Sequence, residues 1–513
     1  MKNKLIKLTK VLALTLAVVF AAPNVAYASA GTMSFFGGTS EGLRMPTVMA
    51  RLADPTLNGR RNIAGQYMYS EMLFVSGNPV LFEGNLNVSQ SGTITDAEMG
   101  NFTMTNSVTS SDRTADNVDL NRNITFGVQW RRQGDQIIFN YNVNAWSETI
   151  TTPEGTFTLD PQQSHFVMSI IEDHNPGAVF YRGDISKRAV YMIGDGETIV
   201  VETTGVIYGF DSPYSSTETQ RLDAFVMAPN WSMSYQVRPS VSVTTYLQYR
   251  DNTLMPISFT GNYMHFMENS SVAAYDIFVV PQPFHDIPTA GNFNIESRST
   301  FEQLIAPDLT FLRGHFAEQD ISRLFAQQII TGEPTHFQPA QLMTRGEFIT
   351  ALVNALRIEV PTAQAATNNI FNRATRIVFP DVMPTRPEYN HIMAAYRSGL
   401  AHGRVDGNFH IDQPITREEA ISILVRGIGL NNVAMNPTPV TAFADSLQIS
   451  DWANRDIAAA LELGLIVGDA NGNLSPRDII SKAEGAALIN RFIDYMREDL
   501  VRDYSERMVN FTW

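Results

Sequence analysis

A four-residue pattern occurs three times in the last third of this chain: Thr or Ser, a basic residue, any residue, then Glu. It reads Thr-Arg-Gly-Glu at 344–347, Thr-Arg-Glu-Glu at 416–419 and Ser-Lys-Ala-Glu at 481–484. A hydroxyl residue followed three positions later by Glu forms a capping box, because each side chain accepts a hydrogen bond from a free amide at a helix start. The pattern therefore predicts three helices that begin at equivalent points of repeated units.

The patterns belong to larger units, which repeat at residues 315–348, 388–420 and 451–485. Each unit contains an aromatic residue, an amphipathic helix, a glycine-containing turn, an apolar residue and then the capping pattern. In the first unit, Phe348 and Leu352 fall on one face of the helix that the pattern starts. The chain from about Ser299 onward is therefore predicted to be helical.

The preceding part of the chain, from about Gly31 to Phe284, has a period of two instead. Residues 139–145 alternate apolar side chains with Asn, and a Gly134-Asp135 turn pair precedes them, so residues 124–146 are predicted to form a hairpin. Many short strands without helical spacers predict an antiparallel β-rich sandwich or barrel. The other strand candidates are residues 79–88, 165–171, 178–183, 197–210, 241–250 and 273–280.

The first thirty residues have the features of an export signal. Four lysines precede the apolar run 11–22, and Ala28-Ser29-Ala30 provides a small-residue cleavage site. A membrane anchor is the alternative, but this run is short for a bilayer span. The predicted organisation is a signal at 1–30, a β-rich surface domain at 31–284, a linker at 285–300, repeats at 301–358, 375–430 and 440–497, and a tail at 498–513.

The charge of the chain limits its partners. Without the predicted signal it would carry 33 basic and 52 acidic side chains, a formal charge of −19. Such a net field disfavours binding to nucleic acid or to an anionic membrane. The chain has no cysteine, which excludes thiol catalysis and cysteine-based zinc sites. No cofactor and no metal site are predicted.

The repeated units resemble S-layer homology domains, the modules that attach exported bacterial proteins to the cell wall. The family's Phe-x-Asp-Val motif is matched by Phe379–Val382 and in part by Phe443–Asp445. Its His-Trp-Ala motif is matched in part by Asp451–Ala453, and its glycine loop by residues 468–476. The capping patterns correspond to the family's Thr-Arg-Ala-Glu motif.

The resemblance implies an all-α, pseudo-threefold assembly of helix-loop-helix repeats. The clefts between the repeats would bind a secondary cell-wall polysaccharide, often one with an anionic, pyruvylated sugar. It also implies binding roles for the motif Asp, the motif Trp, the loop glycines and the basic residue of the capping pattern. In this chain those positions are Asp381, Asp445, Trp452, Gly403, Gly468, Arg345, Arg417 and Lys482.

The chain departs from the family pattern at several of these positions. The first unit has Phe316 where Trp is usual and lacks a clear Phe-x-Asp-Val motif, and the second has Tyr389 near the Trp position. Lys482 keeps the charge of the usual Arg but loses its planar fork. The clefts are therefore expected to be unequal.

The basic residue of each capping pattern needs its own explanation. It stands at the first helical position, where the helix dipole makes a cation unfavourable by about 0.3–1 kcal/mol. Either an ion pair elsewhere in the fold or an anionic ligand at the helix start could compensate. The residues leave these two open, and the resemblance favours the ligand. Trp452 could likewise be a core residue or a platform for a sugar ring.

The β-rich region shows no recognised catalytic motif. Glycoside hydrolysis needs only two carboxylates brought together by the fold, which a sequence does not reveal. The predicted function is an exported surface protein, anchored non-covalently to wall polysaccharide, that displays a structural, lattice-forming or adhesive β-rich domain and can self-assemble. The alternative is a wall-anchored enzyme or carbohydrate-binding protein acting on extracellular polysaccharide.

Overall fold

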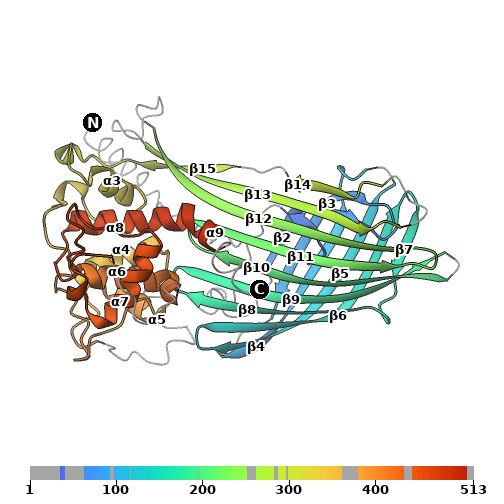
Figure 1. Ribbon diagram of the computed structural model, residues 1–513, viewed down its shortest axis with the longest axis horizontal. Coiled ribbons are helices and arrows are strands. Elements are labelled where there is room, and N and C mark those ends of the chain that lie inside the picture. Colours follow the sequence, from blue (N-terminus) through green and yellow to red (C-terminus); the bar gives the residue numbers. More distant parts are fainter. Residues whose placement is uncertain are drawn as a thin grey trace, which may run out of the picture.

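The computed structural model describes residues 35–40, 63–92, 98–115, 117–194, 196–250, 262–281, 287–295, 299–360, 379–432 and 442–504. The predicted signal at 1–30 lies outside these residues. The strands run along the long axis of the molecule, and the helices gather at one end of them (Figure 1). The chain thus has a β-rich N-terminal region and a helical C-terminal region, as the two periodicities predict.

The described strands belong to one antiparallel sheet, in which most strands pair with their neighbours in the sequence. β8 pairs with β6 and β9, and β15 pairs with β13 beside β14. The strands are β1 (Thr39–Ser40), β2 (Ile63–Leu73), β3 (Val80–Ser91), β4 (Met99–Ser110), β5 (Asp119–Gln133), β6 (Gln136–Thr152), β7 (Gly155–Leu159), β8 (His165–Asn175), β9 (Ala178–Ile193), β10 (Glu197–Asp211), β11 (Ser215–Met227), β12 (Ser232–Arg250), β13 (Asn262–Val279), β14 (Ala290–Ile295) and β15 (Thr300–Ile305).

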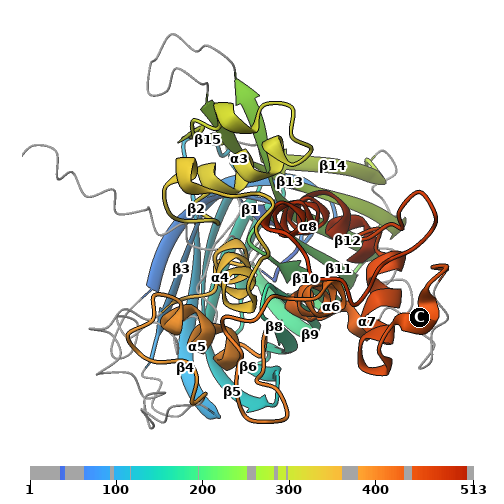
Figure 2. The ribbon, with the colours of Figure 1, turned by 90° about the vertical axis from the view of Figure 1, so that its left-hand side faces the viewer.

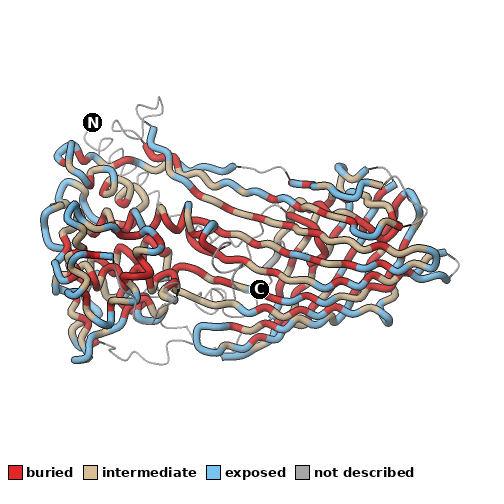
Figure 3. The backbone as a smooth tube through the Cα atoms, viewed as in Figure 1, coloured by how far each residue is buried: buried red, intermediate tan, exposed pale blue. Residues whose placement is uncertain are grey.

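The sheet curls so that its first strands approach its last ones (Figure 2). The Thr39 hydroxyl on β1 hydrogen-bonds the Ser271 hydroxyl on β13. One continuous curled sheet therefore takes the place of the two facing sheets of a sandwich. Buried and exposed positions alternate along the strands (Figure 3), because successive side chains point to opposite faces. The inward side chains form an apolar core inside the curl.

The predicted hairpin at 124–146 is confirmed and forms part of β5 and β6. Gly134, at the turn, has the left-handed φ of +65° that glycine adopts easily. A β-bulge at Asn144 shifts the register, so the alternation changes phase along β6. Ala145, which the alternation placed on the buried face, is therefore exposed, and Trp146 is buried instead.

The region predicted as a linker, 285–300, contains a strand of the sheet and the first residue of another. β14 occupies Ala290–Ile295, and β15 begins at Thr300, inside the predicted boundary of the first repeat. Gly291, Asn292 and Asn294 lie within β14 and pair with residues of β13. The β-rich region therefore extends to Ile305.

In its described residues, the helical region contains three first helices, three central helices and a short final helix. The first helices are α3 (Glu318–Ala326), α5 (Tyr389–Arg397) and α7 (Asp451–Glu462); the central ones are α4 (Arg345–Ala355), α6 (Arg417–Ile428) and α8 (Lys482–Asp494); the last is α9 (Leu500–Asp503). Short 3-10 turns lie at Thr310–Leu312, Pro334–His336, Leu430–Asn432 and Ser446–Gln448, and a π-helical turn spans Tyr495–Asp499. Among the described residues, no helix has the length and apolarity needed to cross a membrane.

The first helix of each unit packs on the central helix of the preceding unit. α5 packs on α4 and α7 packs on α6, while α3 of the first unit packs on α8 of the third. The central helices lie together in the middle of the group, with the first helices around them (Figure 2). Equivalent side chains tie each central helix to the turn of its own unit: Asn354, Arg426 and Arg491 donate to the carbonyls of Ile329, Leu400 and Leu465.

The helical and β-rich regions share a hydrophobic core. Phe180, Phe210 and Tyr214, from the β-rich region, belong to the same buried cluster as the central helices. The Tyr214 hydroxyl donates to the Ala355 carbonyl at 2.8 Å. Residues 498–513 were predicted as a tail, but their described part is helical, and the Tyr504 ring stacks on Phe180 with centroids 5.7 Å apart.

Candidate functional site

The three capping boxes predicted from the sequence are confirmed. The hydroxyls of Thr344, Thr416 and Ser481 each accept a hydrogen bond from the backbone amide of the Glu three residues later. The carboxylates of those glutamates accept in turn from the amide of the capping residue. Each central helix therefore begins where the pattern places it, with two of its free amides satisfied.

The backbone just before each central helix bonds to the same position of the next unit, in a closed cycle. The Ile415 amide donates to the Met343 carbonyl at 3.0 Å, and the Ile480 amide donates to the Ile415 carbonyl at 3.1 Å. The Met343 amide closes the cycle by donating to the Ile480 carbonyl at 3.0 Å. The first amides of the central helices form a second cycle: those of Arg345, Arg417 and Lys482 donate to the carbonyls of Gln413, Asp478 and Gln341.

The basic residues of the capping patterns form a ring of ion pairs with the glutamates of the same patterns. Arg345 lies 3.8 Å from Glu419, Arg417 lies 2.6 Å from Glu484, and Lys482 lies 2.7 Å from Glu347. Each cation thus reaches the glutamate of the next unit, and the third unit reaches the first. An ion pair elsewhere in the fold, one of the two explanations left open by the sequence, is therefore present in every unit.

Each of these glutamates uses one carboxylate oxygen for the helix cap and the other for the ion pair. In the third unit, Glu484 Oε2 accepts from the Ser481 amide at 2.8 Å, and Oε1 accepts from Arg417 at 2.6 Å. Partial burial alone would raise the pKa of Glu484, but the hydrogen bonds from Ser481 and Arg417 outweigh it and lower that pKa. The carboxylate therefore stays ionised, and it fastens its own helix and the neighbouring unit together.

The junction between the first and second units concentrates positive charge. The Arg345 side chain is 9% exposed, donates to the His402 carbonyl at 2.9 Å and lies over the Phe409 ring. Arg404, from the loop of the second unit, donates to Glu419 at 2.6 Å. Burial lowers the pKa of Arg345, and the nearby Arg404 lowers it further against the pull of Glu419. Two guanidinium groups thus share one carboxylate.

The motif aspartates Asp381 and Asp445 hold the glycine loops in place. Asp381 accepts from the amides of Phe409 and His410 at 2.8 and 2.6 Å, and Asp445 accepts from those of Leu474 and Ser475 at 2.8 and 2.7 Å. His410 and Ser475 have left-handed φ values of +62° and +54°, an uncommon conformation for residues other than glycine. Both carboxylates thus have a structural task.

Gly403 and Gly468 begin these loops, and close packing accounts for both. A Cβ atom at Gly403 would lie 2.6 Å from the Phe379 ring, and one at Gly468 would lie 3.1 Å from the Gly472 backbone. The loops then turn back on themselves through paired backbone bonds, such as the Asp469 amide to the Asn473 carbonyl at 2.8 Å. Neither glycine needs a ligand to explain it.

Trp452 is not a core residue, because it is 56% exposed at the start of α7. Phe316, which stands at the equivalent position of the first unit, is 70% exposed and stacks on His315 with ring centroids 4.7 Å apart. Tyr389 of the second unit is half-buried against the helical core. Two of the three units therefore present an aromatic face to solvent at the same place.

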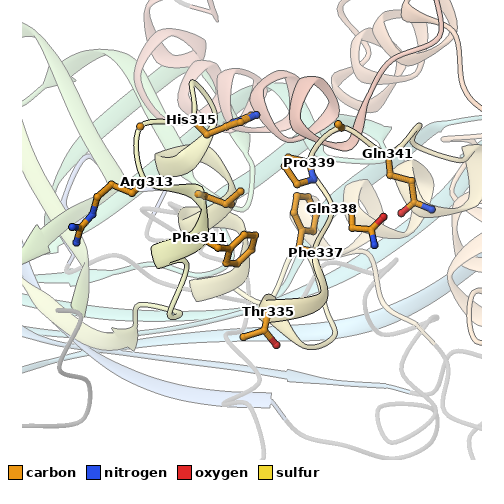
Figure 4. A pocket seen from close by; sticks show the side chains of 11 residues that line it. Phe311, Arg313, His315, Thr335, Phe337, Gln338, Pro339 and Gln341 are labelled. Atoms are coloured by element: carbon orange, nitrogen blue, oxygen red, sulfur yellow. The ribbon is translucent and has the colours of Figure 1, made fainter.

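The first unit contains a hollow beside the position at which the other two units have an aspartate. A turn in which the Leu312 amide bonds the Leu309 carbonyl matches the turns at Phe379–Val382 and Phe443–Ser446, and this places Phe311 at the position of Asp381 and Asp445. Phe311 and Phe337 flank the hollow, with His315 and Thr335 at its rim (Figure 4). Its volume is about 680 Å³. The sequence signal for it was the missing aspartate motif of the first unit.

Two carboxylates do converge inside the sheet, but they are closed off from solvent. Glu71 on β2 and Glu148 on β6 both bind Arg122 on β5, at 2.7 and 2.8 Å. Trp146 and Tyr191 also donate to Glu148. The three charged side chains are at most 7% exposed. Sequence analysis missed this triad, although Arg122 and Glu148 stand in phase with buried apolar neighbours on their strands.

Comparison with known proteins identifies the helical units. The sequence profile of the S-layer homology domain family matches residues 312–349, 378–421 and 442–486. The chain therefore carries three S-layer homology domains, in the order predicted from the repeated motifs. The matches leave the β-rich region unassigned.

Relatives of two kinds share similarity with the chain. An exoglucanase of Acetivibrio thermocellus is 31% identical over 206 residues, 39% of this chain and 18% of the relative. An amylopullulanase of Thermoanaerobacterium thermosulfurigenes is 31% identical over 36% of the chain and 9% of the relative. A surface-layer 125 kDa protein of Lysinibacillus sphaericus is 28% identical over 35% and 14%. The chain spans less than a fifth of the length of each of these three relatives.

Proposed function

We propose that this protein is exported to the cell surface and held to the cell wall by polysaccharide bound to its three S-layer homology domains. The three family matches carry this proposal, together with the surface-layer and cell-surface names of several relatives. The units would be arranged about a pseudo-threefold axis, an arrangement supported by their cyclic backbone bonds and cyclic ion pairs. The β-rich region would be displayed beyond the wall.

The aromatic residues at the starts of the first helices support a glycan-binding surface. Trp452 and Phe316 expose large apolar faces that contribute little to the core. An aromatic face offers a flat apolar surface on which the C–H face of a sugar ring can pack. The hollow beside Phe311 is lined in part by residues 311–315, which directly precede Phe316 in the sequence. It combines aromatic walls with polar groups. This combination is typical of small-molecule sites.

The charge near the central helices supports an anionic ligand. Arg345, Arg404 and Arg426 lie around the junction of the first two units, where Glu419 is the acidic group paired with two of them. Such a junction favours an anionic sugar, such as a pyruvylated one. Because Arg345, Arg417 and Lys482 also hold the ring together, their proposed contacts with glycan would be additional to their structural role. Asp381, Asp445, Gly403 and Gly468 would shape the clefts from the same structural positions.

The β-rich region is proposed to be a structural, lattice-forming or adhesive module. The convergent carboxylates Glu71 and Glu148 are buried and bound to Arg122, so they do not form an open glycosidase cleft. The relatives named as glycan-degrading enzymes match this chain over less than two fifths of its length. No specific observation in the described residues favours a catalytic role for this region.

A pull-down with purified cell-wall sacculi tests the anchoring proposal. Trp452→Ala and Phe316→Ala remove the exposed rings and leave the ion-pair ring intact, so each should lower the bound fraction several-fold without changing the thermal midpoint of unfolding. Leu447→Ala, at a 99% exposed position of the third unit, is the matched control and should bind normally. Undiminished binding by the double aromatic variant would contradict the proposed surface.

The charge of the glycan can be tested with the unchanged protein. Binding to sacculi should weaken as salt concentration rises, because screening reduces contacts between guanidinium groups and anionic sugars. It should also weaken when mild acid has removed pyruvyl groups from the sacculi. Salt-independent binding would point to neutral sugars stacked on the aromatic residues alone.

A further inference from the structure

Among the described strands, β15 has a pairing partner on one side only. Among the described strands it pairs with β13 alone, through six consecutive residue pairs from Asn262–Ile305 to Met267–Thr300. The other edge of Thr300–Ile305 makes no hydrogen bond with any described strand. Natural sheets usually protect such an edge with Lys, Pro, a bulge or a covering segment, because its free backbone groups can pair with another strand. β15 contains no Lys, Pro or bulge, and Glu302 is its one charged residue.

The side chains of β15 are unusually open. Phe301 is 68% exposed and Ile305 is 50% exposed, and both lie on the same face of the strand because they are four residues apart. The register pairs Phe301 with Phe266 and Phe266 with Tyr246, so three rings lie side by side across β15, β13 and β12. Their ring centroids are 6.0 and 4.8 Å apart. This aromatic row stops abruptly at the free edge.

The strand is complementary to a second copy of itself. A twofold axis perpendicular to the sheet would keep the outer faces of both copies on the same side. Directly opposed residues would then share a face, so the two residue numbers of each opposed pair must add up to an even number. When the pairing is centred on Gln303, the two Gln303 residues lie opposite each other. Phe301 of each copy then lies opposite Ile305 of the other. Glu302 would face Leu304, so no like charges lie directly opposite each other. Aromatic and β-branched side chains form favourable cross-strand pairs.

We propose that two copies of this protein associate edge to edge through antiparallel pairing of their β15 strands. The pairing extends the aromatic row of each copy with Ile305 of the other and makes the sheets continuous. It is isologous, so it closes as a dimer. The proposal concerns the β-rich region and does not depend on glycan binding by the helical units.

The absence of cysteine in the chain makes a direct test available. Directly opposed residues of an antiparallel pair have Cα atoms about 4.5–5.5 Å apart, within the range that a disulfide can bridge. The full chain carrying Gln303→Cys should therefore form a disulfide-linked dimer under mild oxidation. Met192→Cys, on β9 at 44% exposure, is the matched control and should remain monomeric on a non-reducing gel.

Two further variants test the register and the side-chain contacts. Glu302→Cys should cross-link less than Gln303→Cys, because the two Glu302 positions would be diagonal neighbours about 7–8 Å apart and not directly opposed. Adding Phe301→Lys to Gln303→Cys should reduce the dimer yield several-fold, and an unchanged circular dichroism spectrum would show that this exposed substitution leaves the fold intact. Equal cross-linking by the Met192→Cys control, or no effect of Phe301→Lys, would overturn the proposal. Polysaccharide that binds the aromatic row and leaves the chain monomeric would also overturn it.

Discussion

The two regions of the molecule use the same pair of side chains, arginine and glutamate, in opposite surroundings. In the sheet, Arg122 joins Glu71 and Glu148 once, at a site where the three side chains are 3%, 7% and 0% exposed. In the helical region, Arg417 and Glu484 are 24% and 34% exposed, and an equivalent pair occurs in each unit. In the described residues, the sheet thus has a buried triad, whereas two of the three ion pairs of the helical ring are partly exposed and the Arg345–Glu419 pair is largely buried.

The difference shows how burial changes what an ion pair does for a fold. Two charges taken out of water lose much of their hydration, so a buried pair contributes little net stability. Removing only one of the two charges is strongly destabilising, because the other stays buried without compensation. A pair near the surface is screened by water and is worth about 0–1 kcal/mol. The buried triad therefore enforces one arrangement of β2, β5 and β6, whereas the ring of pairs adds small, repeated contributions.

The strongest way to break this comparison is Arg122→Met. Removing the guanidinium would leave two buried carboxylates without their ion pair to Arg122, and breaking a buried pair typically costs about 3–5 kcal/mol. Guanidinium denaturation followed by circular dichroism would measure the loss. Arg238→Met, which removes a pair with Asp276 at 41% and 35% exposure, is the control and should cost less than about 1 kcal/mol. Equal losses in the two variants would show that burial does not distinguish them.

Acid should weaken the sheet through the same triad. Burial alone would raise the pKa of Glu148, but Arg122 outweighs it and lowers that pKa below its ordinary value of 4.5. Stability from this group is therefore present above pH 4.5 and is lost as the pH falls through the lowered folded value. Thermal midpoints measured from pH 6 downward should fall less steeply for Glu148→Gln. Glu202→Gln, at an exposed pair, should keep the slope of the unchanged chain.

A change of intermediate size is expected from Asp445→Ala. Its carboxylate accepts from the amides of Leu474 and Ser475, and an unsatisfied buried donor costs about 1–3 kcal/mol. The loss should appear as a lower midpoint in guanidinium denaturation. Asp478→Ala, at an exposed position of the same loop region, is the control. A loss no greater than that of Asp478→Ala would mean that water replaces the carboxylate.

The smallest effects should come from the ring, and their order should follow burial. Arg417→Ala is expected to cost about 0.2–1 kcal/mol, because the pair it breaks is partly solvated. Arg345→Ala should cost more, since that side chain is 9% exposed and also bonds the His402 carbonyl. The denaturation midpoints of Arg417→Ala and Arg345→Ala, measured side by side, show whether burial sets the contribution of each pair within the ring. A reversed order would show that exposure is not what sets the value of these pairs.

Local rules in the sequence predicted the starts of the central helices well. A capping box is made of residues three positions apart, so Thr416 and Glu419 are sufficient to place the start of α6. The hairpin around Gly134 was predictable for the same reason. The partners of Arg417 and Arg122 were not, because Glu484 and Glu71 lie 67 and 51 residues away and only the folded chain brings them close.

A weaker sequence signal did exist for the buried triad. Arg122 falls in phase with Leu120 and Ile124, and all three are buried on β5. A charge at an apolar position of an alternating strand indicates a buried partner, but not which one. The bulge at Asn144 then moves Glu148 onto the same interior. A phase change of this kind depends on strand pairing, so alternation alone does not reveal it.

The closed cycle of the helical units also has a consequence for the gain or loss of a repeat. In an open row of repeats, one copy can be gained or lost at an end and every remaining contact survives. Here Lys482 of the last unit returns to Glu347 of the first, so the deletion of any unit would strand a cation on one side and a carboxylate on the other. The ring is therefore complete only when all three units are present, because removing one unit removes two of its three ion pairs.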